Sequence, residues 1–294
     1  MTGWLARQAL RLYPLAYQRR YGEEMLVLLE EQPPRVGTVF DLLKGAARAH
    51  LRPADASAGV VEAADRVRAS TSGVLLCWVF FAAAGFAYYK TTEDAPFSAV
   101  GHVHPLLRDT HLAVQALALV ASAAVVLGAL PLILSALGQA RREPVLRRTV
   151  ALPLVPVLVF GGLTAVVIAL AHNSAGGSGV ALVWGIAGLA CGVWCVLACR
   201  DALFATRVSA ARLRAALAAG TLVTLAMVAI ALATAVYAIV LSADVAHVAA
   251  EPNGPFQVLS VTTSLIIQVV VMVGAGALAG VATVRGWRVE SEVA

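Results

Sequence analysis

Histidines are the residues of this chain whose type and placement could carry metal or proton chemistry. Five of the six lie in or beside polar loops that we expect on the outer side of a membrane: His102, His104, His111, His172 and His247. Imidazole is a common metal ligand and changes charge near neutral pH. One hypothesis is therefore an outer-face metal or pH sensor. The other is that these loops exclude Lys and Arg and tolerate neutral His instead.

Cysteines form a second candidate, because three of the four repeat every four residues at Cys191, Cys195 and Cys199. This spacing places the thiols on one stripe of a helix, where soft thiolates could hold copper or a cluster. The chain has no Cys-x-x-Cys motif, and thiols in apolar helices usually act as small apolar side chains. Walker A, Gly-x-Ser-x-Gly, His-Glu-x-x-His and dinucleotide-binding patterns are also missing. We therefore expect no cofactor and no enzymatic activity.

The elements that would position these residues follow from composition. Of 294 residues, 60% are hydrophobic and 13% are charged, whereas a soluble domain has about 25% charged residues. This composition predicts an all-α, polytopic membrane protein. The net charge of +5 reflects Lys and Arg in loops, so we expect the lipid bilayer as a partner and no nucleic acid.

Six apolar stretches are long enough to cross a membrane, since a helix needs about 20 residues to span the hydrocarbon. None contains Asp, Glu, Lys, Arg or His, and the backbone in lipid must satisfy its own hydrogen bonds, so each is expected to be helical. The predicted spans are Thr71–Tyr89, Leu112–Leu137, Val150–Ala171, Val180–Ala198, Ala215–Leu241 and Phe256–Val284. The expected domains are a helical prefix over 1–70, a transmembrane domain over 71–286 and a tail over 287–294.

Loop charges predict the orientation. Ten arginines lie in alternate loops and after the last span, while the other three loops contain only Lys90 and Arg108. By the positive-inside rule both termini are cytoplasmic, in what would be the cell membrane. The ten are Arg141, Arg142, Arg147, Arg148, Arg200, Arg207, Arg212, Arg214, Arg285 and Arg288.

The spans themselves favour packing over transport. Gly188-x-x-x-Gly192 and Gly276-x-x-x-Gly280 allow helices to approach closely, within one chain or, alternatively, in a homo-oligomer. Ionisable residues in spans usually mark ion pathways, and none occurs here. A permease remains the alternative hypothesis, and it predicts a mid-membrane cavity lined by Gln268, Thr224, Thr234 or Ser122.

The first 70 residues read as short amphipathic helices. One helix is predicted over Leu10–Glu31 with Pro14 in its first turn, a second from Thr38 to Leu51, and a weaker segment over Gly59–Ala69. The apolar stripe of the first helix is expected to pack against Val39, Leu42 and Leu43. Its members are Tyr17, Tyr21, Met25 and Leu28, spaced by four, four and three.

The run from Arg11 to Met25, Arg-Leu-Tyr-Pro-Leu-Ala-Tyr-Gln-Arg-Arg-Tyr-Gly-Glu-Glu-Met, carries a resemblance. It is similar to an N-terminal segment of uncharacterised bacterial multi-span membrane proteins of actinobacterial type, related to permease prefix domains. Here Tyr17 replaces the more usual Trp and Gln18 the usual charged residue. The resemblance implies a cytoplasmic prefix domain and no particular activity.

The leading functional hypothesis is a non-enzymatic regulatory or transport-accessory membrane protein. Its specified N-terminal helices contrast with apolar spans that lack chemical groups, so they are expected to bind a partner protein in the cytoplasm. The candidate partner-binding residues are Tyr17, Arg19, Arg20, Tyr21, Glu23 and Glu24.

Overall fold

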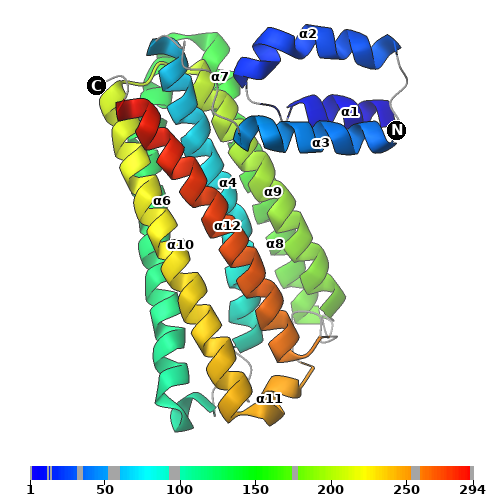
Figure 1. Ribbon diagram of the computed structural model, residues 1–294, viewed down its shortest axis with the longest axis vertical. Helices are drawn as coiled ribbons and strands as arrows, with labels where there is room; N and C mark the ends of the chain where they lie inside the picture. Colours follow the sequence, from blue (N-terminus) through cyan, green and yellow to red (C-terminus); the bar gives the residue numbers. More distant parts are fainter. Residues whose placement is uncertain are drawn as a thin grey trace. The chain divides into compact units, whose positions relative to one another are not determined.

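The computed structural model describes residues 2–11, 13, 15–31, 36–51, 60–92, 100–173, 178–252 and 259–291 (Figure 1). The fold is all-α, as the composition predicts, with long apolar helices preceded by short N-terminal ones. The chain divides into two compact units, Met1–Ala63 and Ala64–Ala294. The expected domain boundary at residue 70 lies inside a continuous helix, α4 (Val60–Thr92).

The first unit contains α1 (Thr2–Arg11), α2 (Leu15–Glu31) and α3 (Val36–Leu51). Helix α1 packs against both α2 and α3. Its buried residues include Ala6 and Ala9, whose small side chains allow neighbouring helices to approach, and Leu10. Tyr13 follows α1 and is 5% exposed, with its ring against Gly45 of α3. A Cβ on Gly45 would overlap the Tyr13 hydroxyl, so this contact requires glycine.

The prediction of one helix over Leu10–Glu31 is right at its end and wrong at its start, because Leu10 and Arg11 end α1 and a bend at Tyr13 precedes α2. The Tyr13 N–H donates to the Leu10 carbonyl at 3.1 Å. Proline disfavours helical backbone in the residue before it and cannot donate to a preceding turn. The Tyr-Pro pair in the sequence therefore lies between two helices, and α2 begins at the residue after Pro14.

The predicted apolar stripe of α2 is partly wrong. Met25 and Leu29, with Leu42 of α3, pack against Leu10 and Tyr13, whereas Leu28 is 60% exposed. Residues three or four positions apart share a helical face, so the spacing of Met25 to Leu29 fits a stripe as well as that of Met25 to Leu28. The predicted partners Tyr17 and Leu43 have side chains outside the described part of the structure.

The second unit contains six helices long and apolar enough to cross a membrane, as judged over the described residues. The chain is thus a multi-pass membrane protein by helix length and hydropathy. These helices are α4, α6 (Pro105–Arg142), α8 (Leu154–Asn173), α9 (Ser178–Ala205), α10 (Ala210–Asp244) and α12 (Val261–Ser291). Two short helices lie at the ends of the bundle: α7 (Pro144–Ala151), which forms one candidate span with α8, and α11 (Ala246–Ala250).

Several helices extend past the predicted spans. Of the segment predicted over Gly59–Ala69, residues 60–69 are continuous with the first span in α4, and residues 287–291 of the predicted tail belong to α12. The sixth span begins at Val261 instead of Phe256, after an isolated bridge between Pro252 and Ser260. A membrane-spanning helix can continue beyond the hydrocarbon into water, where its residues are polar. A hydropathy pattern therefore underestimates the length of such a helix.

Helix α10 has the largest buried share of the six over its most apolar part, and it packs mainly against α6 and α12. Its Met227 is fully buried, as are Leu265 and Met272 of α12. Helices α8 and α9 pack against each other and expose most of their apolar surface. Figure 1 shows α7 and the turn between α9 and α10 at one end of the unit, with α11 at the other. The alternating helix directions therefore gather the arginine-bearing loop segments at the α7 end.

Candidate functional site

The predicted partner-binding residues lie on α2. Glu23 and Glu24 are exposed and Tyr21 is half-buried, while the side chains of Tyr17, Arg19 and Arg20 lie outside the described part of the structure. Exposure of the glutamates leaves them available to a partner.

A larger surface on α2 includes residues that the sequence reasoning missed. Leu26, Val27 and Leu28 are 40%, 52% and 60% exposed. Exposed glutamates flank them on both sides in the sequence, and residues 21–31 contain no Lys or Arg. We call this the α2 surface: Glu23, Glu24, Leu26, Val27, Leu28, Glu30 and Glu31. Glu30 forms an exposed ion pair with Arg7 of α1, with 3.7 Å between Oε1 and the guanidinium, and a pair this exposed adds little to the packing of α2 on α1.

Histidines are not gathered into one site among the described residues. His102 and His247 are exposed, and His104 is half-buried at the N-terminal cap of α6. The side chain of His172 is outside the described part. Within that part, no group of three or more His, Cys, Asp or Glu side chains is placed to hold a metal ion.

His111 belongs instead to an aromatic cluster in the bundle. Its Nδ1 lies 3.4 Å from the Tyr88 hydroxyl, and its Nε2 lies 2.9 Å from Nε2 of Gln115. The ring of Tyr88 meets Tyr237 of α10 edge-on, with 5.6 Å between centroids. This arrangement ties together α4, α6 and α10, so His111 has a packing role that its place in the sequence does not reveal.

Buried polar side chains continue from this cluster toward α12. Gln268 donates through Nε2 to Oγ1 of Thr91 at 3.1 Å, while its Oε1 has no partner among the described residues. Oγ1 of Thr234 and Oγ of Ser264 are likewise buried without a described partner. Thr224 bonds to Thr283 at 3.1 Å, and Ser122 is exposed on α6. The four residues of the permease hypothesis therefore do not share one surface.

The four cysteines are free and half-buried. Sγ of Cys195 on α9 lies 3.7 Å from the carbonyl oxygen of Pro153, in the turn before α8. This contact fits a thiol that acts as a small side chain and weak donor.

The predicted packing glycines face different neighbours. A Cβ on Gly188 would lie 2.9 Å from the Phe160 ring of α8, and one on Gly192 would lie 2.8 Å from Val79 of α4. Cβ atoms on Gly276 and Gly280 would lie at ordinary contact distance from Val228 and Thr224 of α10. The two glycines of the α9 motif therefore face two different helices, whereas those of the α12 motif both face α10.

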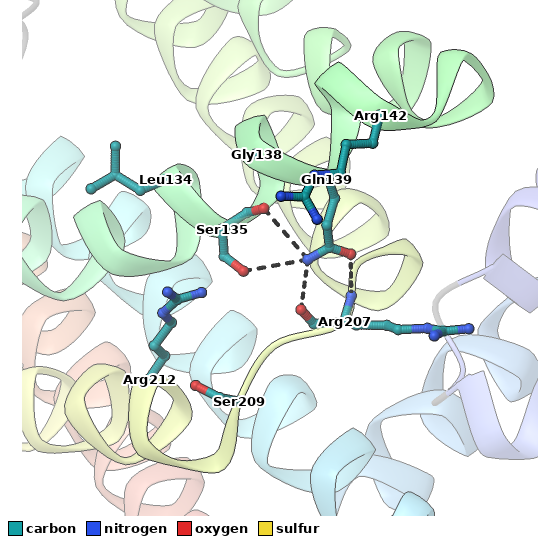
Figure 2. Close-up of a pocket in the computed structure, with 8 residues that line it drawn as sticks. All are labelled: Leu134, Ser135, Gly138, Gln139, Arg142, Arg207, Ser209 and Arg212. Carbon is teal, nitrogen blue, oxygen red and sulfur yellow. Dashed lines mark hydrogen bonds between the residues drawn. The ribbon is translucent and has the colours of Figure 1, made fainter.

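A pocket of about 390 Å³ lies at the α7 end of the bundle, between α6 and the α9–α10 turn. Figure 2 shows how the Gln139 side chain connects its two walls. The Gln139 amide donates to the Arg207 carbonyl at 2.6 Å and accepts from the Arg207 N–H at 2.8 Å. The lining residues are Leu134, Ser135, Gly138, Gln139, Arg142, Arg207, Ser209 and Arg212.

In the sequence these arginines indicate membrane topology only, and the pocket is not evident there. The linked residues Gln139 and Arg207 are 68 positions apart, and no local pattern marks such a pairing. The sequence does offer one indication of the pocket: two loops that are expected at the same membrane face both contain arginines.

Comparisons of the chain with models of protein families, with curated proteins and with solved structures found no match.

Proposed function

We propose that this protein is a non-enzymatic membrane adaptor whose N-terminal unit binds a partner protein through the α2 surface. The observation that carries the proposal is the exposure of Leu26, Val27 and Leu28 in a compact unit that already has its own core. Contiguous apolar side chains on a water-facing helix stabilise an interface more than they stabilise the free unit. The bundle would then serve as the anchor.

The charge of the α2 surface favours a partner of particular chemistry. Four exposed glutamates accompany the apolar side chains, and no cation lies in the same half of the helix. An anionic lipid surface would repel this arrangement. A protein segment with apolar anchors beside Lys or Arg would complement it, because opposite charges steer association and fix register.

The proposed location is the cytoplasm. The arginine-bearing loop segments share the α7 end of the bundle, and an excess of Arg in loops is typical of the cytoplasmic side. The resemblance of Arg11–Met25 to prefix segments of membrane proteins supports the same side. The candidate partners are a regulator and a transport subunit, and identification of the crosslinked protein distinguishes them.

Photo-crosslinking in native membranes tests the proposal on the full chain. A photoreactive residue at Leu28 should give a discrete protein adduct, and the same residue at exposed Gly37 of α3 serves as the matched control. Replacing Glu23, Glu24, Glu30 and Glu31 by Gln should reduce the Leu28 adduct by about tenfold or more. Mass spectrometry of the adduct should map the crosslink to a segment rich in Lys or Arg.

Two results would contradict the proposal. One is an equal yield of protein adducts from Leu28 and Gly37, which would mean that α2 has no preferred partner. The other is a lipid adduct at Leu28 that survives the glutamate replacements, which would place α2 on the membrane surface.

A permease is the second candidate function, and the buried polar atoms of Gln268, Thr234 and Ser264 favour it. Unpartnered polar atoms in a membrane bundle cost free energy and often mark function. Its weakness is that Thr224 is bonded to Thr283 and Ser122 faces outward. The outer-face sensor has less support, since the described histidines point to different surroundings.

A further inference from the structure

The pocket at the α7 end has the features of an anion site. Arg142 and Arg212 reach it from α6 and from the first turn of α10, and Ser209 lies at the N-terminal cap of α10 without a side-chain cap bond. Figure 2 shows the Arg207 side chain extending away from Gln139, so Arg142 and Arg212 supply the nearby charge. Arginine presents paired N–H donors that match phosphate oxygens.

These guanidinium groups are not neutralised within the described part of the chain. No described carboxylate forms an ion pair with Arg142, Arg207 or Arg212; the ion pairs there join Arg7 to Glu30, Arg68 to Asp65 and Arg108 to Asp109. The described lining of the pocket contains arginines and no carboxylate, and such a lining favours an anionic ligand.

The pocket is fixed by the fold and is not formed by loose loops. Gln139 holds both backbone groups of Arg207 and also lies 3.4 Å from the carbonyl and hydroxyl of Ser135. The Thr206 carbonyl, next along the chain, accepts from the Arg68 guanidinium at 3.1 Å. The α9–α10 turn is therefore held to α6 on one side and to α4 on the other.

One wall of the pocket is apolar and faces outward. Leu134 lines it and is 60% exposed, and it continues a surface of α6 formed by Leu130, Ile133 and Leu137, which are 46%, 51% and 45% exposed. In a membrane protein such a surface contacts acyl chains. A ligand with a phosphate and attached acyl chains would occupy the pocket and the adjoining face of α6 together.

We propose that this pocket binds the phosphate of an anionic phospholipid, held by Arg142 and Arg212 with the acyl chains along α6. The site lies at the membrane face where the loop charges place the cytoplasmic leaflet, which is rich in anionic lipid. This site is separate from the α2 surface, so either proposal can fail without the other.

The test measures lipid affinity of the purified full chain. A fluorescent phosphatidylglycerol is titrated onto the protein in neutral detergent, with the matching phosphatidylcholine as reference. We expect tighter binding of phosphatidylglycerol, weakened about tenfold or more in R142Q/R212Q. The control R141Q/R148Q removes the same charge from exposed residues outside the pocket at the same end, and its affinity should change less than about twofold.

Three results would overturn the proposal. Equal weakening in both double variants would show a general effect of surface charge. Equal affinity for phosphatidylglycerol and phosphatidylcholine would show that the pocket does not prefer an anionic lipid. Displacement of phosphatidylglycerol by inorganic phosphate at similar concentration would make a soluble anion the ligand instead of a lipid.

A conservative variant keeps the test decisive if R142Q/R212Q does not fold, as judged by size-exclusion chromatography. R142K/R212K retains both charges and loses the paired donors of guanidinium. We expect about threefold weaker binding of phosphatidylglycerol. Affinity unchanged from the parent chain would contradict a pocket that recognises phosphate through arginine geometry.

Discussion

The α7–α8 segment and α10 have the same mean hydropathy, yet 44% of the most apolar part of α10 is buried against 6% for the α7–α8 segment. In water, apolar helices compete for the interior. In a bilayer, lipid tails are as apolar as leucine, so hydropathy does not decide which helix lies inside. The difference shows that packing shape and polar contacts sort these helices.

Polar side chains illustrate the sorting. Helices α10 and α12 bring Thr224, Thr234, Thr283 and Gln268 into the interior, where Thr224 bonds to Thr283. Helices α8 and α9 have one such pair in the described part, the Trp184 indole N–H donating to Thr164 at 2.9 Å. We therefore expect substitutions to cost most along α10 and α12 and least on the outer face of α8.

The largest expected effect comes from truncating the core. L265A on α12, at a residue with no exposed surface, should lower the free energy of unfolding by about 2–5 kcal/mol, because the cavity is not refilled. The matched change L158A on α8, where Leu158 is 74% exposed, should cost little. Unfolding in mixed micelles of rising SDS fraction measures both. Equal costs would mean that the outer face of α8 is covered by protein, such as a second copy.

The next effect concerns how the α8–α9 pair is attached to α4. G192V should cost about 1–3 kcal/mol, because its added carbons meet Val79 and force strain. G185V on the same helix makes the same change in helix propensity and has nothing within 4 Å of its Cβ position. The same SDS titration compares them. A G192V chain as stable as G185V would show that α9 packs loosely on α4.

A smaller effect is expected for the hydrogen bond inside the α8–α9 pair. W184F keeps an aromatic ring against Phe160 and removes the donor to Thr164. Bonds of this kind contribute about 0.6 kcal/mol in membrane proteins. W194F, at a half-exposed tryptophan of the same helix, corrects for the loss of indole area. Thermal denaturation with tryptophan fluorescence should show a slightly lower Tm for W184F alone.

The smallest effect is expected where the bundle is most polar. Q268M removes a bond to Thr91 but also an unpartnered buried oxygen, and these changes nearly cancel. Thr91 retains its bond to the Ala87 carbonyl at 2.8 Å. The free energy of unfolding should change by less than about 0.5 kcal/mol. A much larger loss would indicate that Gln268 has a partner beyond the described residues, as a permease would require.

Sequence alone determined the fold class. Six stretches of sufficient length without ionisable residues had to be helices, since lipid offers the backbone no other partners. The alternation of arginines in the loops likewise predicted that they share one end of the bundle. These features are local or periodic, so they can be read without knowing which residues meet.

Tertiary structure decided the rest. Helix α1, which ends before the bend at Tyr13, packs against both α2 and α3. As a result Leu29 packs against the core of this unit, whereas the predicted Leu28 is exposed. Gly188 and Gly192 share a motif but face α8 and α4. Gln139 bonds to Arg207, 68 residues later in the chain, and both line the arginine pocket. Each outcome depends on contacts between segments that are distant in the sequence, and for the two glycines these are apolar helix faces that differ in shape far more than in hydropathy.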